Sequence, residues 1–553
     1  MATRRRPPLL LISAGIWLAY FLLGLLLFAA ALRGVWISDD ISIVRDNEPL
    51  HTLTLANLAS FFDPHSSASI SAHNFTPISV LLHSLAWQCF GSDVLGHHVV
   101  NVAFHALVTV LLLRVFLALR LSGPVAFAGA TFFFVHPANV EPAAWISQLK
   151  TLASTAGCLA ALLLWERRPG WATFCFALAL LTKVTAVFVI PVAMALDWWR
   201  TGHVRWRWIA LCVAVTIAYM IPEMGVFRLI GEAGPLDESS AVWLRTIVAI
   251  AARYLVMAVT AHGVSAFHDP PRAHSPWDPW WLAGLLLLTL FAVRMIYTVW
   301  RREPEGVFWV WAAAAFVPVS QILPFANEMG DRYLYTILPG LIGATLAAGV
   351  SAAEWIESAC ARRGASPLPQ SLGQGRVLAV LVVAVAIAFG VQSQVRAGIW
   401  RSESAMVADS ILNYPNSVLA RWSRARMVAI TGDAGETAAA LRRAMELGFD
   451  RHDKVIGDPA FDAVRSDPRI QALIHEMART WIARLQPLPE LDQARALSLA
   501  GAYYALGDLD AGIRTLEHAL ELDGSLSETV RRDLDALRKQ AASRTRRTER
   551  PDG

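Results

Sequence analysis

The feature that most constrains this chain is a run of 24 residues, 9–32, that contains no charged side chain. At 1.5 Å per residue the run is about 36 Å long as an α-helix, which is enough to cross a bilayer. The apolar core of a cleavable signal peptide is shorter, at about 7–15 residues. Because Arg4, Arg5 and Arg6 precede the run, we expect an uncleaved first span with its N-terminus inside.

The composition indicates that such runs are widespread in the chain. Hydrophobic residues make up 55% and charged residues 17%, whereas a soluble globular chain carries about 25% charge. These values exclude a disordered protein and a soluble Rossmann or barrel enzyme. The five cysteines are isolated and lack the spacing of a disulfide framework or zinc site. The net charge of +4 gives no indication of nucleic-acid binding.

Ten further apolar runs bring the predicted number of spans to eleven. They are 96–119, 122–137, 146–165, 170–183, 185–199, 208–222, 279–300, 305–323, 333–352 and 376–394. The turns between them alternate between basic and acidic, which places the basic turns inside. The basic turns carry Arg120, Arg167, Arg168, residues 200–207, Arg301, Arg302, Arg362 and Arg363, and the acidic turns carry Asp39, Asp40, Glu141, Asp237, Glu238 and Glu328.

One apolar run, 242–260, does not fit this alternation. It contains Arg245 and Arg253, and the flanking turns already alternate without it. We therefore predict a re-entrant or interfacial helix. If the run crosses the membrane instead, the number of spans becomes twelve and the C-terminal domain moves inside.

The remaining segments define the domains. The outer loop 33–95 is the longest outside segment, and 55–62 and 77–90 are predicted to be short helices on the membrane surface. The membrane domain is expected to end at residue 395. Residues 396–540 have dense charge and no run long enough to span, and 541–553 are polar, basic and predicted to be disordered.

The soluble part contains two segments with the register of tetratricopeptide repeats, which are helix–turn–helix units. The matching positions are Ala425, Gly432, Asp433, Leu441 and Ala444 in one segment, and Ala500, Tyr503, Gly507, Asp508, Leu516 and Ala519 in the other. A generic helical bundle is the alternative. In either case we expect an α-helical domain that binds a protein-like partner or packs on the membrane domain.

Acidic residues in two outer loops are candidates for catalysis. Asp39 and Asp40 follow the first span, and carboxylates at a membrane boundary are costly unless they are solvated or used. One of them could accept the proton of an acceptor hydroxyl as a general base; the alternative is a solvated loop. Glu141, close to His136 in the second outer loop, could supply a further carboxylate, and a capped polar loop is the alternative.

Cations at outer helix ends are candidates for binding a phosphate. Lys150, Lys183 and Arg332 lie there against the positive-inside trend. Binding the phosphate of a lipid-linked donor would explain them, and snorkelling of their side chains is the alternative. Asp331 and Tyr333 flank Arg332, and pairing of Asp331 with Arg332 would lock this loop.

A polar stripe is predicted on one helix. His98, Asn101 and His105 are spaced by three and four residues, so they share a helix face. Such a stripe is more typical of contacts between helices than of a metal site. We therefore expect no metal here.

Several segments, in their order along the chain, resemble those of one family. These are SDDISIVRDN, FTPISVLL, HHVVNVAFHAL, VHPANVEPAAWISQLKTLAS, LLTKVTAVFVIP and NEMGDRYLY. The set resembles the TMTC-like proteins, which are tetratricopeptide-bearing GT-C membrane glycosyltransferases related to protein O-mannosyltransferases. The resemblance covers nearly the whole chain. The usual acid–Arg–Lys run reads Gln148-Leu149-Lys150 here, so only Lys150 can inherit a role, and Val184 stands where many bacterial relatives have proline.

The resemblance implies an all-α GT-C membrane bundle whose active site and repeats both lie on the outer side. It implies transfer of a hexose such as mannose from a polyprenyl-phosphate donor to a protein Ser or Thr hydroxyl. Asp39 or Asp40 would act as the base, and Glu141 would assist by orienting the substrate or the catalytic loop. Lys183, Arg332 and Lys150 would bind the donor phosphate. The expected location is a bacterial inner membrane with the C-terminal domain in the periplasm, and no cofactor is expected.

Three other functions remain open from the sequence. The same donor could serve a lipid or cell-surface glycan acceptor. The chain could instead be a non-catalytic scaffold whose repeats hold protein partners. A transporter is disfavoured, because the acidic residues cluster in an outer loop and not in mid-span.

Overall fold

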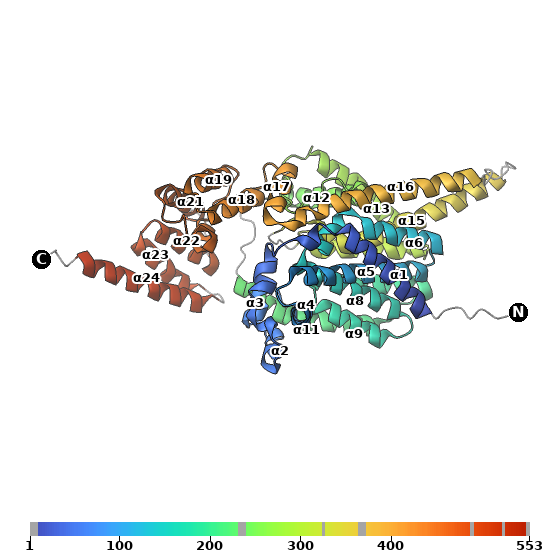
Figure 1. Ribbon diagram of the computed structural model, residues 1–553, viewed down its shortest axis with the longest axis horizontal. Coiled ribbons are helices and arrows are strands. Elements are labelled where there is room, and N and C mark those ends of the chain that lie inside the picture. The colour runs from blue at the N-terminus through green and yellow to red at the C-terminus, as the bar shows by residue number, and fades with distance from the viewer. Residues whose placement is uncertain are drawn as a thin grey trace. The chain divides into compact units, whose positions relative to one another are not determined.

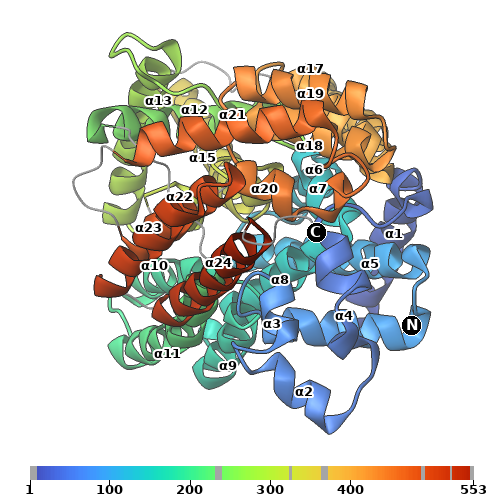
Figure 2. The ribbon, with the colours of Figure 1, turned by 90° about the vertical axis from the view of Figure 1, so that its left-hand side faces the viewer.

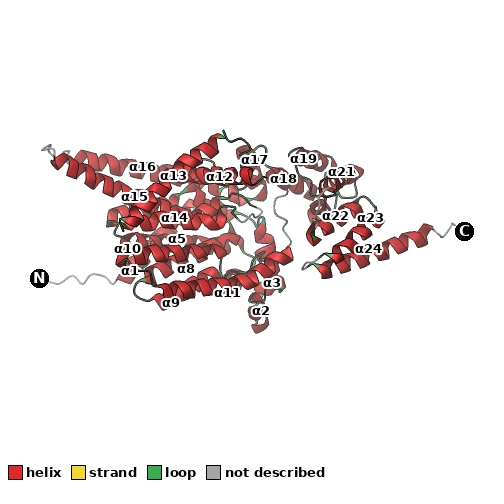
Figure 3. Ribbon diagram, turned by 180° about the vertical axis from the view of Figure 1, so that it is seen from behind, coloured by secondary structure: helices red, strands yellow, loops and turns green. Residues whose placement is uncertain are grey.

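The computed structural model describes residues 9–230, 239–322, 327–362, 372–486, 492–522 and 526–548. The described residues form helices and loops and contain no strand (Figure 3). The chain divides into two compact units, one that extends to Met406 and one that follows it. Arg4, Arg5, Arg6, Asp237, Glu238 and Arg363 lie outside the described residues.

Each of the eleven predicted spans coincides with an apolar helix of the first unit (Figure 1 and Figure 3). These helices are α1 (Leu9–Leu27), α5 (Val94–Ala118), α6 (Gly123–Val135), α8 (Leu149–Trp165), α9 (Pro169–Leu180), α10 (Val189–Thr201), α11 (Trp206–Ile230), α13 (Pro279–Trp300), α14 (Pro304–Phe316), α15 (Asp331–Arg362) and α16 (Leu372–Ala397). Eight helices of the described chain, α12 (Ser240–Thr260) among them, are long and apolar enough to cross a membrane, and four shorter apolar helices accompany them. The chain is therefore an all-α polytopic membrane protein, as predicted.

Consecutive helices of the first unit run in alternating directions, so the turns between them gather at two ends. The basic end contains the arginine-rich turns 119–122, 166–168, 202–205 and 301–303. The loop end contains the long segment between α1 and α5 and the segments that follow α6, α9 and α14. Proline at the first helical position fixes several of the helix starts, because its missing N–H has no partner to lose there. Examples are Pro169, Pro279 and Pro304.

Both ends of α12 contact segments at the loop end. The Arg245 guanidinium donates hydrogen bonds to the carbonyl oxygens of Ala273 at 2.9 Å and His274 at 2.8 Å, just before α13 begins. Near the other end of the helix, the Ala258 carbonyl lies 3.2 Å from Nε2 of His136, just after α6. We therefore retain the prediction that 242–260 does not cross the membrane, although its length and composition would allow it.

The long loop between α1 and α5 folds into short helices around a small core of its own. The predicted helices are present as α2 (Leu55–Phe61) and α4 (Pro77–Phe90), with α3 (Ser67–Ser71) between them (Figure 2). Thr54 caps α2 by accepting a hydrogen bond from the backbone N–H of Asn57 at 3.1 Å. The core includes the buried Leu50, Phe61 and Val80. This packing gives the segment that carries the acid pair a fixed support.

The second unit consists of packed helices, and both predicted helix–turn–helix segments are present. They are α18 (Val418–Ile430) with α19 (Ala434–Glu446), and α22 (Gln493–Ala505) with α23 (Leu509–Glu521). Other helices of this unit are α20 (His452–Gly457), α21 (Pro468–Leu485) and α24 (Ser527–Thr548). The boundary between the units, after Met406, falls within α17 (Glu403–Asn413). Gly432 and Gly507 adopt positive φ at the two turns, with φ of 81° and 77°. Their assignment to the tetratricopeptide family stays a prediction.

The side chains in these two hairpins follow the predicted register. Asp433 and Asp508 cap the second helix of each hairpin by accepting hydrogen bonds from Glu436 N and Ala511 N. The small and apolar positions are buried between the helices. These are Ala425, Leu441 and Ala444 in the first hairpin and Ala500, Leu516 and Ala519 in the second.

Two predicted boundaries differ from the structure. The membrane unit continues to Met406 and not to 395, because Trp400 is buried and stacks on Trp145 of that unit at 5.4 Å between ring centroids. Residues 541–548, predicted to be disordered, continue α24. That helix is rich in Ala, Leu, Arg and Lys, which favour helix, and the buried Val530 and Leu534 hold its first turns. Residues 549–553 lie outside the described residues.

Candidate functional site

The two adjacent aspartates after α1 occupy different environments. Ser38 has a φ of 48°, in the left-handed region, and turns the chain just before them. Asp40 is fully buried, and its Oδ1 accepts a hydrogen bond from the backbone N–H of Ser147 at 2.7 Å. Burial, together with the charge of Asp39, raises the pKa of Asp40 to about 8. Asp40 is therefore mostly protonated at neutral pH and anchors the loop to the segment before α8.

Asp39 faces the cations of the site. Its side chain is half-buried, and its charge interacts with those of Lys150 and Arg332. These two cations come from the first turns of α8 and α15. Of the two predicted base candidates, Asp39 is the one that lies among groups able to bind a charged substrate.

Glu141 and Arg332 form a buried ion pair. Glu141, in α7 (Val140–Ala144), is fully buried. Its Oε1 accepts a hydrogen bond from Nη1 of Arg332 at 2.6 Å, and its Oε2 accepts one from the Arg332 backbone N–H at 2.8 Å. The guanidinium also lies over the rings of Tyr333 at 4.8 Å and Trp145 at 5.6 Å. Glu141 thus holds both the start of α15 and its cation, which is an orienting role.

The two lysines differ in how they are held. Nζ of Lys183 donates a hydrogen bond to Oγ1 of Thr151 at 2.7 Å, and that hydroxyl donates to Oε1 of Gln148 at 2.7 Å. Lys150 is half-buried and makes no hydrogen bond or ion pair within the part of the chain that the structure describes. Its charge interacts with those of Lys183 and Arg332. Lys150, the least favoured of the three cations in the sequence analysis, is therefore the one whose ammonium group is free to bind a ligand.

The site also contains an acidic residue that sequence reasoning missed. Glu223 in α11 accepts hydrogen bonds from the backbone N–H of Phe75 at 2.7 Å and from the Tyr219 hydroxyl at 3.2 Å. Its charge interacts with that of Lys150. The sequence did contain a signal for this residue: Glu223 is a single carboxylate within an apolar helix, directly after Pro222.

Asp331 pairs with residues other than Arg332. Its Oδ1 lies 2.7 Å from Nε2 of His268, and its Oδ2 lies 3.9 Å from Nη2 of Arg396. It therefore joins α15 to the segment before α13 and to α16. Tyr333 is buried next to Arg332, and its hydroxyl accepts a hydrogen bond from Nη2 of that residue at 3.3 Å.

The predicted polar stripe of α5 is buried between helices. His105 lies 2.9 Å from the Tyr335 hydroxyl through Nδ1 and 3.1 Å from the Phe134 carbonyl through Nε2. Asn101 donates a hydrogen bond to the Trp145 carbonyl at 2.8 Å, and His98 is buried on the same face. In the described ranges no group of three or more His, Cys, Asp or Glu side chains could hold a metal ion.

His136 supports the turn after α6. Its Nδ1 accepts a hydrogen bond from the backbone N–H of Ala138 at 3.2 Å, so Nε2 carries the proton that is donated to Ala258. Burial lowers the pKa of His136 to about 4, so the ring is neutral at pH 7. This residue is part of the scaffold around Glu141.

Several known proteins show similarity to this chain. Human protein O-mannosyl-transferase TMTC3 is 28% identical over 171 residues, Caenorhabditis elegans protein O-mannosyl-transferase F38B6.6 is 25% identical over 211, and mouse protein O-mannosyl-transferase TMTC1 is 27% identical over 227. The chain is similar to the TMTC proteins. This agrees with the resemblance predicted from the order of the motifs.

The TMTC similarity covers only parts of each chain. The alignments include 28%, 36% and 36% of this chain, and 19%, 30% and 24% of the relatives in the same order. The matched region thus spans less than a third of the length of these curated relatives. No protein-family model matches the chain, and no solved structure matches it.

Proposed function

We propose that the protein is a membrane glycosyltransferase of GT-C type that transfers a hexose, such as mannose, from a polyprenyl-phosphate donor to a protein Ser or Thr hydroxyl. The names of these relatives, protein O-mannosyl-transferases, support transfer of mannose to oxygen. Within this chain, the proposal rests on the convergence of Lys150, Lys183 and Arg332, whose charges interact with one another, and on Asp39, whose charge interacts with those of Lys150 and Arg332. Like charges repel one another in a poorly solvated site, so a bound anion would stabilise this arrangement.

Asp39 is the proposed general base. The acceptor oxygen forms a bond to the anomeric carbon of the sugar, and the bond from that carbon to the phosphate oxygen breaks. The hydroxyl proton moves to the Asp39 carboxylate, and the electron pair of the broken bond stays on the departing polyprenyl phosphate. Lys150 and Lys183 offset the charge that develops on this leaving group.

The other residues of the site have positioning roles in this proposal. Glu141 holds Arg332, whose positive charge adds to the field at the phosphate. Asp40, protonated at neutral pH, fixes the loop through Ser147. The C-terminal unit is proposed to bind the acceptor protein.

A test of the proposal compares wild-type protein with Asp39→Asn in membranes supplied with polyprenyl-phosphate mannose and a Ser/Thr peptide. Removing a general base should lower transfer by about 10²- to 10⁴-fold, at an unchanged melting temperature. Asp46→Asn is the control, because Asp46 lies in the same loop in an exposed pair with Arg45. Mass spectrometry of peptides and glycolipids reads the product.

Wild-type transfer by Asp39→Asn would overturn the role of Asp39. A hexose found on glycolipids and absent from peptides would overturn the protein acceptor and retain the donor chemistry. Transfer that is absent from wild-type protein with both acceptors would overturn the enzymatic function.

A further inference from the structure

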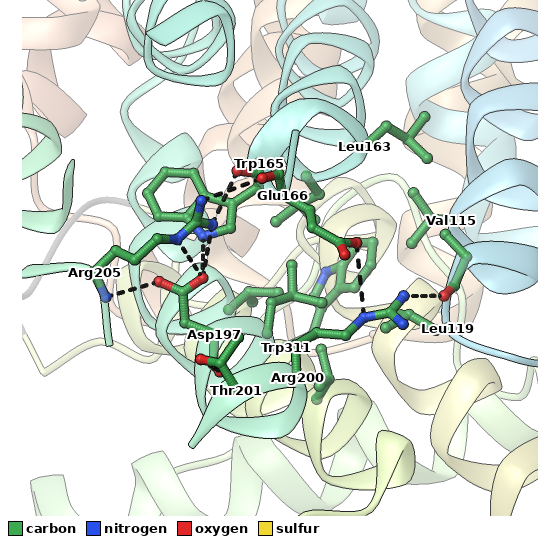
Figure 4. A pocket seen from close by; sticks show the side chains of 15 residues that line it. Val115, Leu119, Leu163, Trp165, Glu166, Asp197, Arg200, Thr201, Arg205 and Trp311 are labelled. Atoms are coloured by element: carbon green, nitrogen blue, oxygen red, sulfur yellow. Dashed lines mark hydrogen bonds and ion pairs between the residues drawn. The ribbon is translucent and has the colours of Figure 1, made fainter. Parts of the chain in front are cut away.

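A cavity lies at the basic end of the membrane unit, where it is separate from the candidate site. Its volume is about 170 Å³, and it lies between the ends of α5, α8 and α10 and the start of α14 (Figure 4). Apolar side chains form most of its lining, including Val115, Leu163, Val192, Leu196 and Trp311. An apolar cavity of about 150 Å³ stays dry and accepts small apolar groups.

One ion pair in the lining, between Asp197 and Arg205, already has hydrogen-bond partners within the protein. Asp197 accepts hydrogen bonds from Nε of Arg205 at 2.9 Å and from Nε1 of Trp165 at 2.9 Å. The remaining guanidinium nitrogens of Arg205 donate to the backbone carbonyls of Glu166 at 3.3 Å and Trp165 at 2.9 Å. This pair therefore braces the wall and leaves no cation for a ligand.

Arg200, in contrast, has hydrogen-bonding capacity to spare. Its Nη2 donates to the Ala118 carbonyl at 2.8 Å, and its Nε lies 3.8 Å from a carboxylate oxygen of Glu166 (Figure 4). The Glu166 side chain is 65% exposed, so solvent screens this pair. Nη1 of Arg200 has no hydrogen-bond partner in the described part of the chain. The planar guanidinium is well suited to a phosphate.

The surroundings of Arg200 match a membrane interface. Its guanidinium lies 4.1 Å from the centre of the Trp199 ring, and that of Arg120 lies 5.5 Å from the same ring. Positive charge is in excess around it, because eight arginines and four acidic residues lie in 119–122, 166–168, 197–207 and 301–305. Tryptophan and arginine are typical of the level at which lipid headgroups lie.

We propose that this cavity binds an anionic membrane phospholipid. The headgroup phosphate would accept hydrogen bonds from Arg200, with Arg120 adding positive charge, and part of one acyl chain would occupy the apolar cavity. Basic pockets between transmembrane helices recognise anionic lipids in this way. The apolar lining is the reason for choosing a lipid over a free phosphate ion. This site is independent of the proposed transferase activity.

The experiment uses the full chain in phosphatidylcholine nanodiscs with and without phosphatidylglycerol. Native mass spectrometry counts the phosphatidylglycerol retained, and the melting temperature is measured in parallel. Wild-type protein should retain the lipid and melt at a higher temperature in its presence. Arg200→Gln should weaken retention about tenfold or more, as expected for loss of a charge-assisted contact.

Two further variants make the result specific. Arg301→Gln removes the same charge from an exposed position at the same end and should retain the lipid like wild type. Ala118→Leu keeps every charge but adds bulk at the cavity lining, and should reduce retention. Unchanged retention by Arg200→Gln, or equal losses in Arg200→Gln and Arg301→Gln, would overturn the proposal, as would full retention by Ala118→Leu.

Discussion

At the scale of single residues, chemically identical side chains in this protein differ through partners that are distant in sequence. Asp39 and Asp40 are adjacent, yet only Asp40 is fully buried and bound by Ser147. The sequence identified the pair as a candidate site because of its place beside the first span. It could not distinguish the two carboxylates, since the partner of Asp40 lies 107 positions further along the chain.

Asp40 should make the stability of the protein depend on pH. Its pKa is about 8 in the folded state and 3.8 in the reference state, so the folded protein binds its proton more tightly. The free energy of unfolding should therefore fall as the pH rises from about 4 to about 8. Asp40→Asn removes this titration, so its melting temperature should fall less than that of wild type between pH 5 and pH 8.5.

Asp46→Asn is the control for this measurement, because Asp46 is exposed and paired with Arg45. Its melting temperatures should follow those of wild type at each pH. If the melting temperature of Asp40→Asn fell as much as that of wild type between pH 5 and pH 8.5, Asp40 would not be the group whose titration changes the stability.

Lys150 should lower stability while supporting donor binding. A half-buried ammonium group that makes no hydrogen bond or ion pair within the described chain is desolvated at a cost. Lys150→Met keeps the aliphatic length and removes the charge, so it should raise the melting temperature. Loss of a charge-assisted contact costs roughly 1.5–3 kcal/mol, so affinity for a polyprenyl-phosphate donor should fall about 10- to 150-fold.

The matched control is Lys454→Met, which removes an exposed lysine from α20 in the other unit and should change neither quantity. Wild-type donor affinity in Lys150→Met would exclude this lysine from phosphate binding. A lowered melting temperature would show that its charge stabilises the fold.

The ion pairs show the same limit of sequence reasoning. Glu141 and Arg332 were both predicted to belong to the site, but with separate roles, and their direct pairing across 191 positions was not predicted. Pairing of Asp331 with its neighbour Arg332 was one alternative that the sequence left open, and in the structure Asp331 pairs with His268 and Arg396. Sequence periodicity places side chains on a face of a helix, but it does not specify which helices meet.

At the scale of elements, the sequence predicted most of the helices. Apolar runs identified the membrane helices because burial in lipid requires long stretches of uncharged residues. The two hairpins of the second unit followed from small residues at contact positions and from Gly-Asp at the turns. The end of α24 was not predicted, since a polar, basic composition is shared by disordered tails and exposed helices.

Gly432 offers a test of the first hairpin. Its φ of 81° favours glycine, and no atom lies within 4 Å of the position that a Cβ would occupy, so Gly432→Ala introduces backbone strain without a steric clash. Left-handed backbone costs a non-glycine residue roughly 1–2 kcal/mol. The backbone amides of α18 and α19 should therefore exchange with solvent about 5- to 30-fold faster, because the hairpin opens more often.

Gly457→Ala is the control, because that glycine also has open space around it but does not have a positive φ. Exchange in α18 and α19 should stay at the wild-type rate in this variant. Unchanged exchange in Gly432→Ala would mean that the turn does not limit the stability of the hairpin.

At the scale of the whole molecule, we predict eleven membrane crossings, with α12 remaining on the outer side without crossing. An odd number of crossings places the N-terminus and the C-terminal unit on opposite sides of the membrane. The alternation of basic and acidic turns supports this topology. Placing the basic end in the cytoplasm and residues 407–553 in the periplasm is therefore our expectation.

Cysteine labelling tests this topology. In a chain with the native cysteines replaced, Ser239→Cys and His262→Cys, both exposed and at opposite ends of α12, should react with a membrane-impermeant maleimide from the periplasmic side. A phosphatase fused to the C-terminus should be active in the same cells. Labelling of only one position together with an inactive fusion would show that α12 crosses.

The position of α12 has a consequence for how the protein is made. Several groups that hold this helix follow it in the sequence: the carbonyls of Ala273 and His274 bind Arg245, and the ring of Trp280 lies 4.4 Å from the Arg253 guanidinium. A nascent chain that has emerged only as far as Thr260 lacks all of these groups. The ribosome must therefore synthesise about 20 more residues, up to the first turn of α13 (Pro279–Trp300), before these contacts can form. This part of the bundle is thus assembled only after α13 has begun to emerge.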